Sequence, residues 1–329
     1  MKSLRVFVCV VLTALGLLLW PTGLVAAATK VTTKVTGPAP VEAANSAIAA
    51  ADPAYAAYDD GRYLTAMNLA KHAAANGEPA AATLVGRLFA DGLGVQRDPA
   101  AAATWFGKGA ELGDANGKFE LGLLMAKGVG TARNPAKAAD LFEAAAAAGS
   151  LPAKYNLGVL LAAGQGRPPD QARAAQLITE AAKGGDAQAR YDLGQMYANG
   201  AGVPWDDVQA AHWTGLAATD GLPDAQVEFA VMLFKGRGVP QDRSRAAWFF
   251  TAAAERGNPV AQNRLANLHA YGIVYTKDLV TAAKWHLLAR QAGVSDFKLD
   301  VFLASLTAEQ RRQADADAAA WTERVNPAP

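Results

Sequence analysis

Cysteine is almost absent from this sequence. Among 329 residues only Cys9 carries a thiol, and it lies in an apolar run near the amino terminus. One thiol cannot form an intramolecular disulfide, and the Cys-x-x-Cys pairs of zinc and redox sites are missing. The folded part of the chain must therefore be stabilised by packing alone.

The sequence also lacks an excess of charge of either sign. It has 31 Lys and Arg residues against 30 Asp and Glu, which gives a net charge of +1 at pH 7. Proteins that bind nucleic acids or anionic lipid usually carry a strong positive field. The balance predicts no nucleic-acid binding and, apart from the apolar segment at the amino terminus, no membrane binding.

Known catalytic motifs are missing as well. The chain has no Gly-x-Ser-x-Gly elbow, no His-Glu-x-x-His and no phosphate-binding loop. A Ser-x-x-Lys occurs at Ser295–Lys298, but without the Ser-Asp-Asn or Lys-Thr-Gly that accompanies it in penicillin-binding enzymes. We predict no catalytic residue, no cofactor and no metal site, and we keep a cell-wall-directed hydrolase or penicillin-binding protein as the alternative function.

What the chain does contain is glycine at a fixed spacing of 36 residues. One series is Gly92, Gly128, Gly164, Gly200, Gly236 and Gly272, and a second is Gly113, Gly149, Gly185, Gly221, Gly257 and Gly293. A period of this length is typical of a solenoid, in which each unit buries its apolar face against its neighbours. Six repeats occupy residues 79–294.

Each repeat has the pattern of two helices joined by a turn. In the second repeat the first helix is expected over residues 115–127, Gly128 ends it, and the next helix begins after Asn134. Equivalent positions hold Asp98, Asp170, Asp206, Asp242 and Asp278, whose side chains can cap the second helix. Paired alanines and one bulky residue, Trp105 in the first repeat, are expected to pack between the helices.

The repeat pattern resembles that of the Sel1-like repeat, a relative of the tetratricopeptide repeat. The fourth repeat carries it most fully, at Ala189, Leu193, Gly194, Tyr197, Gly200, Gly202, Val203, Asp206, Ala210, Ala211, Trp213 and Gly221. The resemblance covers about two thirds of the chain. It implies an all-α fold, a right-handed α-solenoid of helix-turn-helix repeats, and a non-catalytic role as a protein-interaction scaffold.

The segments on either side of the array have their own expected roles. Residues 46–78 are predicted to form an amino-terminal capping partial repeat, and residues 295–329 a carboxyl-terminal capping helical segment. Residues 1–28 have the basic start, apolar run and small-residue cleavage site of a signal peptide, and residues 29–45 have the composition of a flexible linker. This predicts a periplasmic or secreted protein; the alternative is an inner-membrane anchor formed by residues 6–28.

A partner-binding surface is expected on the outward positions of the first helices, along the concave groove of the solenoid. Positions three or four apart share a helix face, and their mixed polar and apolar character suits a peptide or a partner helix. The candidates are Glu120, Leu123, Lys127, Asn156, Val159, Asp192, Gln195, Asn199, Glu228, Val231, Lys235, Arg264, Asn267 and Tyr271. An ordinary solvated face is the alternative for any single residue.

Two histidines stand out because they replace apolar residues of the pattern. His269 and His286 lie in the sixth repeat, and a helical hairpin could bring them together. A pH-sensitive or weak metal-binding pair is one interpretation, and packing near the end of the array is the other. Two histidines without a further ligand do not make a zinc site.

These observations predict a monomeric adapter in the bacterial periplasm. It would bind a partner protein or peptide in the groove, and the resemblance implies a regulatory role, in envelope signalling or exopolysaccharide export.

Overall fold

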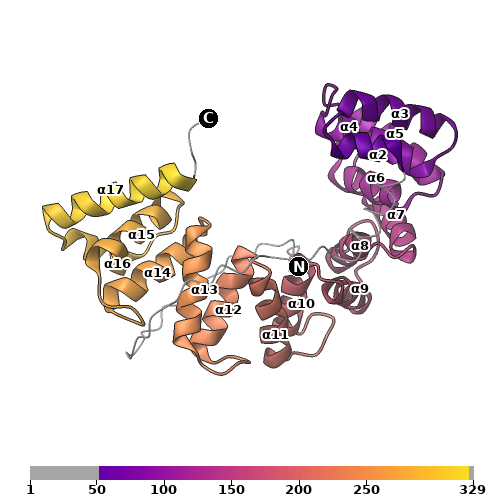
Figure 1. The fold of residues 1–329 in the computed structure, drawn as a ribbon. Coiled ribbons are helices and arrows are strands. Elements are labelled where there is room, and N and C mark those ends of the chain that lie inside the picture. Colours follow the sequence, from indigo (N-terminus) through magenta and orange to yellow (C-terminus); the bar gives the residue numbers. More distant parts are fainter. Residues whose placement is uncertain (1–51, 326–329) are drawn as a thin grey trace, which may run out of the picture. The chain divides into compact units, whose positions relative to one another are not determined.

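The computed structural model describes residues 52–325, and this part of the chain contains sixteen helices and no strand (Figure 1). The helices follow one another as antiparallel pairs joined by short turns. This confirms the predicted all-α solenoid of helix-turn-helix repeats. The predicted signal peptide at residues 1–28 and linker at residues 29–45 lie outside the described residues.

Each repeat consists of two helices of thirteen residues. The first helices are α4 (Pro79–Asp91), α6 (Ala115–Lys127), α8 (Leu151–Ala163), α10 (Ala187–Asn199), α12 (Pro223–Lys235) and α14 (Pro259–Tyr271). The second helices are α5 (Pro99–Glu111), α7 (Pro135–Ala147), α9 (Gln171–Lys183), α11 (Asp207–Thr219), α13 (Arg243–Glu255) and α15 (Leu279–Gln291). The flanking helices are α2 (Pro53–Asp59), α3 (Tyr63–Ala75), α16 (Phe297–Ala304) and α17 (Ala308–Val325).

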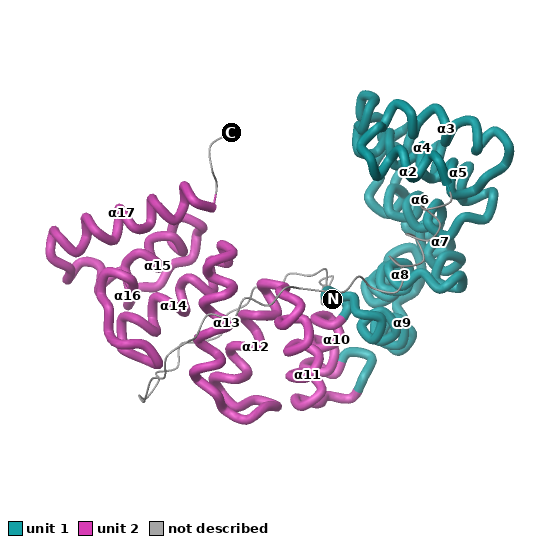
Figure 2. The backbone as a smooth tube through the Cα atoms, in the orientation of Figure 1, with its two compact units in different colours: residues 1–10, 33–189, 201–203 teal, residues 11–32, 190–200, 204–329 magenta. Residues whose placement is uncertain are grey.

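The chain divides into two compact units (Figure 2). Of the described residues, the first unit holds 52–189 and 201–203, and the second holds 190–200 and 204–325. The division passes through α10. Each unit has hydrophobic clusters of its own, such as the one around Phe142 in the first unit and the one around Phe249 in the second.

The second helices begin as the sequence predicts. Asp98 accepts hydrogen bonds from the backbone N–H groups of Ala100 and Ala101, both at 3.0 Å. The equivalent side chains make the same type of bond in every other repeat, at Asn134, Asp170, Asp206, Asp242 and Asp278. This column therefore caps helices, because it satisfies amide groups that have no partner within the helix.

The core agrees with the predicted columns in part. The first alanine of each pair is fully buried, as at Ala102 and Ala138, and the bulky residue is buried in three repeats, at Leu177, Phe249 and Trp285, but only partly buried in the other three, as at Trp105. The next residue, Phe106, is buried, and so are its equivalents Phe142, Ile178, Thr214, Phe250 and His286. Successive residues of a helix point about 100° apart, so a shift of one position selects a different face.

The turn between the two helices of a repeat needs glycine twice. Gly128 adopts the left-handed conformation that ends α6, with φ 73°, and Gly130 has φ 67°. A Cβ atom on Gly130 would also collide with the carbonyl oxygen of Pro99 in the preceding second helix. The sixth repeat has Val274 at the position of Gly130, and among the described residues it is the only non-glycine with a positive φ, 68°.

The end of the array is closed by two further helices. A capping box starts α17: the Thr307 N–H donates to Gln310 Oε1 at 3.0 Å, and the Gln310 N–H donates to Thr307 Oγ1 at 3.2 Å. Trp321 of α17 packs edge-on against Trp285 of α15, with ring centroids 6.0 Å apart. Its indole N–H also donates to Glu255 of α13 at 3.0 Å, so α17 contacts the last two second helices.

Candidate partner-binding surface

The predicted surface residues fall into three columns along the first helices, a surface that we call the first-helix face. Glu120, Leu123 and Lys127 of α6 show how the columns differ: Glu120 and Leu123 are partly buried, whereas Lys127 is exposed. The equivalents of Glu120 are all partly buried, at Asn156, Asp192, Glu228 and Arg264, and the predicted equivalents of Lys127 are all exposed, at Asn199, Lys235 and Tyr271. In each unit the accessible part of this face is therefore the carboxyl-terminal end of each first helix.

The second of the three columns, Leu123 and its equivalents, is mostly part of the core. Leu123 and Val231 pack against the hydrophobic cores of their units, and Gln195 and Asn267 are partly buried. Only Val159 is exposed, at 38%. The sequence pattern could not show this, because it does not say how closely neighbouring first helices approach.

In the first unit the polar side chains of this face mostly bond within the protein. Arg87 of α4 lies 3.5 Å from Glu120 of α6. Burial raises the pKa of the Glu120 carboxyl, and Arg87 partly offsets that rise. Asn156 donates to the carbonyl of Pro152 in its own helix at 2.9 Å. Arg87 was not among the predicted residues, although it stands one repeat before Leu123 in the same column.

The second unit contains a similar ion pair and a larger polar network. Glu228 of α12 pairs with Arg237 at 2.7 Å, in the turn that follows the same helix. Asn263 and Asn267 of α14 donate to Asp296 Oδ2 at 3.3 and 3.2 Å. Burial raises the pKa of Asp296, but the hydrogen bonds that its carboxylate accepts, from these two amides among others, together lower it by more, so the net direction is downward.

Arg264 differs from its neighbours on this face. It is partly buried, and burial lowers the pKa of its guanidinium, while Asp296 acts in the opposite direction. With the residues that the structure describes, it forms no hydrogen bond or ion pair. A partly desolvated guanidinium without a partner is suited to receive a carboxylate, which it can bind through two parallel N–H groups.

Two exposed side chains lie near the carboxyl-terminal ends of the neighbouring first helices in this unit. Tyr271 follows Arg264 by two helical turns on the same side of α14 and is 51% exposed. Lys235 is its exposed equivalent on α12. Together with Arg264 they give the first-helix face of the second unit two cations and one aromatic ring.

The two histidines have separate partners in the structure. His286 is fully buried, with Nε2 3.0 Å from Asp300 Oδ1, and Arg290 approaches the same oxygen at 3.3 Å. His269 stacks on Tyr275 at 4.6 Å between ring centroids, and burial lowers its pKa. Both side chains are therefore packed near the end of the array, each against a different partner. In the part of the chain that the structure describes, no cluster of three or more His, Cys, Asp or Glu residues could hold a metal ion.

The Ser-x-x-Lys sequence lies at the start of α16. Ser295 and Lys298 are both exposed. The residue that caps α16 is Asp296, which accepts from the Lys298 N–H at 3.1 Å. Among the described residues Ser295 forms no side-chain hydrogen bond with an acid or a base, so the structure gives the hydrolase alternative no support.

The family model for the Sel1 repeat matches six consecutive segments of the chain, at residues 79–114, 115–150, 151–186, 187–222, 223–258 and 259–294. These bounds agree with the six repeats that the glycine spacing predicts.

Solved structures give the same result. A Sel1 repeat protein from Oxalobacter formigenes is 30% identical, with a TM-score of 0.65, over 74% of this chain and 97% of that one. The protein c5321, a protective antigen of uropathogenic Escherichia coli with an SLR fold, is 25% identical, with a TM-score of 0.54, over 80% of this chain and 65% of that one. A comparison with curated proteins gives no match. Among the described helices, none is both long and apolar enough to cross a membrane.

Proposed function

Because the chain belongs to the Sel1 repeat family, we propose that it is a non-catalytic adapter that binds a partner protein on the first-helix face of its second unit. Sel1 repeat proteins are generally protein–protein interaction scaffolds. The observation that carries the proposal is Arg264, whose guanidinium is partly buried and attracted by Asp296 but forms no direct hydrogen bond or ion pair with the described residues.

The chemistry of this face indicates what the partner presents. Removing a guanidinium from water costs free energy that a carboxylate can offset, because charge-assisted hydrogen bonds strengthen where water is excluded. The exposed Lys235 would add long-range attraction for an acidic segment. Tyr271 offers a rigid aromatic surface of the type enriched in protein interfaces. A peptide or helix with a carboxylate beside an apolar side chain fits these three residues.

The location of the adapter is part of the same proposal. The basic start, the apolar run from Val6 to Trp20 and the small residues at 26–28 support export to the periplasm or beyond the cell. The similar Escherichia coli protein is a protective antigen, which is consistent with an exported chain. A regulatory role in envelope signalling or exopolysaccharide export would follow from binding a partner there. The alternative remains an inner-membrane anchor at residues 6–28.

Affinity capture from envelope extracts tests the binding surface. The wild-type chain is compared with the double variant Arg264→Gln, Tyr271→Ala and with a control double variant, Lys127→Gln, Asn156→Ala, on the first-helix face of the first unit. We expect the Arg264 variant to recover its partners at roughly a tenth of the wild-type amount or less, since loss of a buried charge pair exceeds about 1.4 kcal/mol. Equal recovery by all three proteins would show that the partner binds elsewhere.

A further inference from the structure

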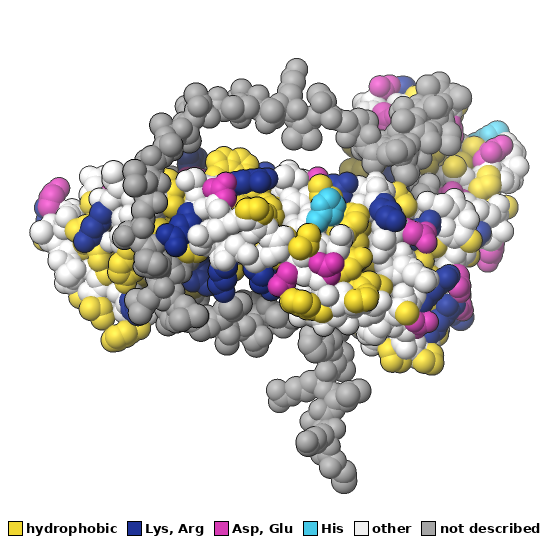
Figure 3. Space-filling model, turned by 90° about the horizontal axis from the view of Figure 1, so that it is seen from below, with side chains coloured by type: hydrophobic (Ala, Val, Ile, Leu, Met, Phe, Trp, Pro, Cys, Tyr) yellow, Lys and Arg dark blue, Asp and Glu magenta, His cyan; other side chains and the backbone are white. Residues whose placement is uncertain are grey.

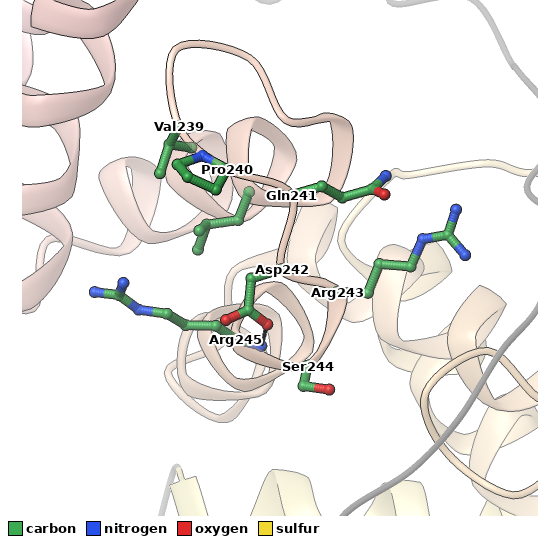
Figure 4. A pocket seen from close by; sticks show the side chains of 8 residues that line it. Val239, Pro240, Gln241, Asp242, Arg243, Ser244 and Arg245 are labelled. Atoms are coloured by element: carbon green, nitrogen blue, oxygen red, sulfur yellow. Dashed lines mark hydrogen bonds between the residues drawn. The ribbon is translucent and has the colours of Figure 1, made fainter.

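Two hollows lie next to each other on the second unit, on the side formed by the second helices. The larger has a volume of about 580 Å³ and is lined by Leu233, by the turn from Val239 to Asp242 and by the first residues of α13 (Figure 4). The smaller has a volume of about 320 Å³ and lies mainly along α11. Both include Val239 and Arg245, so the two hollows meet at these residues.

The smaller hollow is lined mainly by apolar residues of α11 and of the elements packed against it. Gly215 has no side chain, and a Cβ atom there would lie 2.9 Å from the ring of Phe229, so the ring forms the floor of the hollow. Leu216 and Val208 line it from α11, and Val208 is 63% exposed. The positions equivalent to Leu216 in the first unit hold Lys108, Ala144 and Glu180. The repeat fold therefore does not require an apolar residue here.

Two large apolar side chains that are close in sequence to residues lining the hollows are also exposed. Trp205 precedes α11 and is 65% exposed, and Trp248 of α13 is 57% exposed. Seen from below in Figure 3, hydrophobic and basic side chains lie next to each other on the surface. Exposed aromatic side chains of this size are more typical of an interface than of a solvated surface.

The charged group at the junction of the hollows is Arg245. Its guanidinium lies over the rings of Phe229 at 5.6 Å and Phe249 at 5.9 Å, and it is exposed. It makes no ion pair with any residue of the described ranges. In Figure 4, Arg243 and Arg245 point in opposite directions, and only Arg245 also lines the smaller hollow. The one carboxylate in the lining, Asp242, caps α13 by accepting from the Arg245 backbone N–H at 2.9 Å.

We propose that the two hollows together bind an acidic, amphipathic peptide segment of another protein. Its apolar side chains would enter the hollow along α11, and a carboxylate would pair with Arg245, whose orientation is already held by two aromatic rings. This site is separate from the first-helix face and would give the adapter a second partner surface. The chain's own residues 29–45 fit less well, because they carry Lys30 and Lys34 against Glu42.

Fluorescence anisotropy with synthetic peptides tests this proposal on the full chain. The probe is a labelled twelve-residue peptide that alternates Glu with Leu and Phe. Three comparison peptides replace Glu by Lys, replace Leu and Phe by Ser, or reproduce residues 29–45. We expect the acidic, apolar peptide to bind most tightly of the four. Arg245→Glu and Leu216→Glu should each weaken its binding about tenfold or more, as for central residues of an interface.

Matched controls come from the same positions two repeats earlier. Arg173 is the exposed equivalent of Arg245, and Ala144 is the exposed equivalent of Leu216. Arg173→Glu and Ala144→Glu should leave binding within about twofold of wild type. The milder variant Arg245→Gln removes the charge but keeps a polar, exposed side chain, so a loss of binding in this variant would not be due to unfolding. Circular dichroism shows whether each variant keeps its helices.

Several results would overturn the proposal. These are no binding of the acidic peptide, equal binding by the Arg245 variants and the controls, or tighter binding of the Lys peptide or the peptide of residues 29–45. A dimer in sedimentation that Leu216→Glu dissociates and the acidic peptide does not would assign the surface to a second copy of the chain. Arg264→Gln should leave peptide binding unchanged. The peptide experiment therefore tests the two hollows independently of the first-helix face.

Discussion

At the scale of single residues, Val274 departs from the repeat pattern at a cost in backbone strain. It is 9% exposed and contributes to the core of the second unit, yet its φ is 68°, where five repeats have glycine. A β-branched residue in the left-handed region is strained by about 1–3 kcal/mol. Burial of its side chain stabilises the fold by a similar amount. Replacement by glycine alone would therefore change the free energy of unfolding too little to reveal the strain.

Comparison of two substitutions separates strain from burial. Val274→Ala and Val274→Gly both lose the buried methyl groups, but only glycine relieves the strain. We expect Val274→Gly to be more stable than Val274→Ala by about 1 kcal/mol, measured as the free energy of unfolding in urea. The control is Val301, an exposed residue within α16, where glycine should be less stable than alanine by about 1 kcal/mol. The same order at both sites would contradict the strained turn.

The residue scale also shows what the sequence could predict. The caps at Asp98 and its equivalents follow from local signals, because a side chain at the start of a helix needs only its own next residues as partners. Arg87 pairs with Glu120 of the next repeat, and Asn263 bonds to Asp296 of the segment that follows the last repeat. Such pairs form only if the packed helices bring the two side chains within reach. The repeating sequence pattern gives no information about that distance.

At the scale of helices, the last repeat is completed by α17. Trp321 is 8% exposed, packs against Trp285 and bonds to Glu255. In a solenoid each repeat is stabilised only by its neighbours, so the terminal one depends on its cap. We expect Trp321→Ala to destabilise the chain by about 3 kcal/mol and to increase amide hydrogen exchange in α15 and α17 more than in α4 and α5. Trp248→Ala, at an exposed tryptophan, should change stability by less than about 0.5 kcal/mol.

Uniform hydrogen exchange in Trp321→Ala would mean that the array unfolds as one cooperative body rather than from its end. The helix scale also explains why the predicted column of bulky core residues is only partly right. Phe249 and Trp285 are buried as predicted, whereas in the first repeat Phe106 is buried and Trp105 is only partly buried. The choice between two adjacent residues depends on how each helix is rotated about its axis, and since both are large and aromatic in the first repeat, residue type could not decide between them.

At the scale of the whole molecule, the repeat fold and the balanced net charge indicate that function depends on binding surfaces. In the described residues polar side chains mostly cap helices or pair between neighbouring helices, as at Asp98 and Glu120. Two groups that differ from this pattern are Arg264 of α14, which is partly buried, and Arg245 of α13, which lies over two aromatic rings. The sequence could indicate Arg264, because the outward face of the first helices follows from the repeat pattern, but not the hollows beside Arg245, because these depend on how α11, α12 and α13 pack.

Which partners can reach these surfaces depends on the compartment, and this gives the last prediction. Lys2 and Arg5 before an apolar run, followed by small residues at 26–28, predict cleavage during export. Sequencing the amino terminus of the protein from fractionated native cells should give Ala28 or Thr29 in a soluble periplasmic or extracellular fraction. Because a chain cleaved there keeps no cysteine, its folding should be indifferent to periplasmic disulfide formation. Met1 in the membrane fraction would instead show an anchor and restrict the partner to the membrane surface, whereas Met1 in the cytosol would refute export.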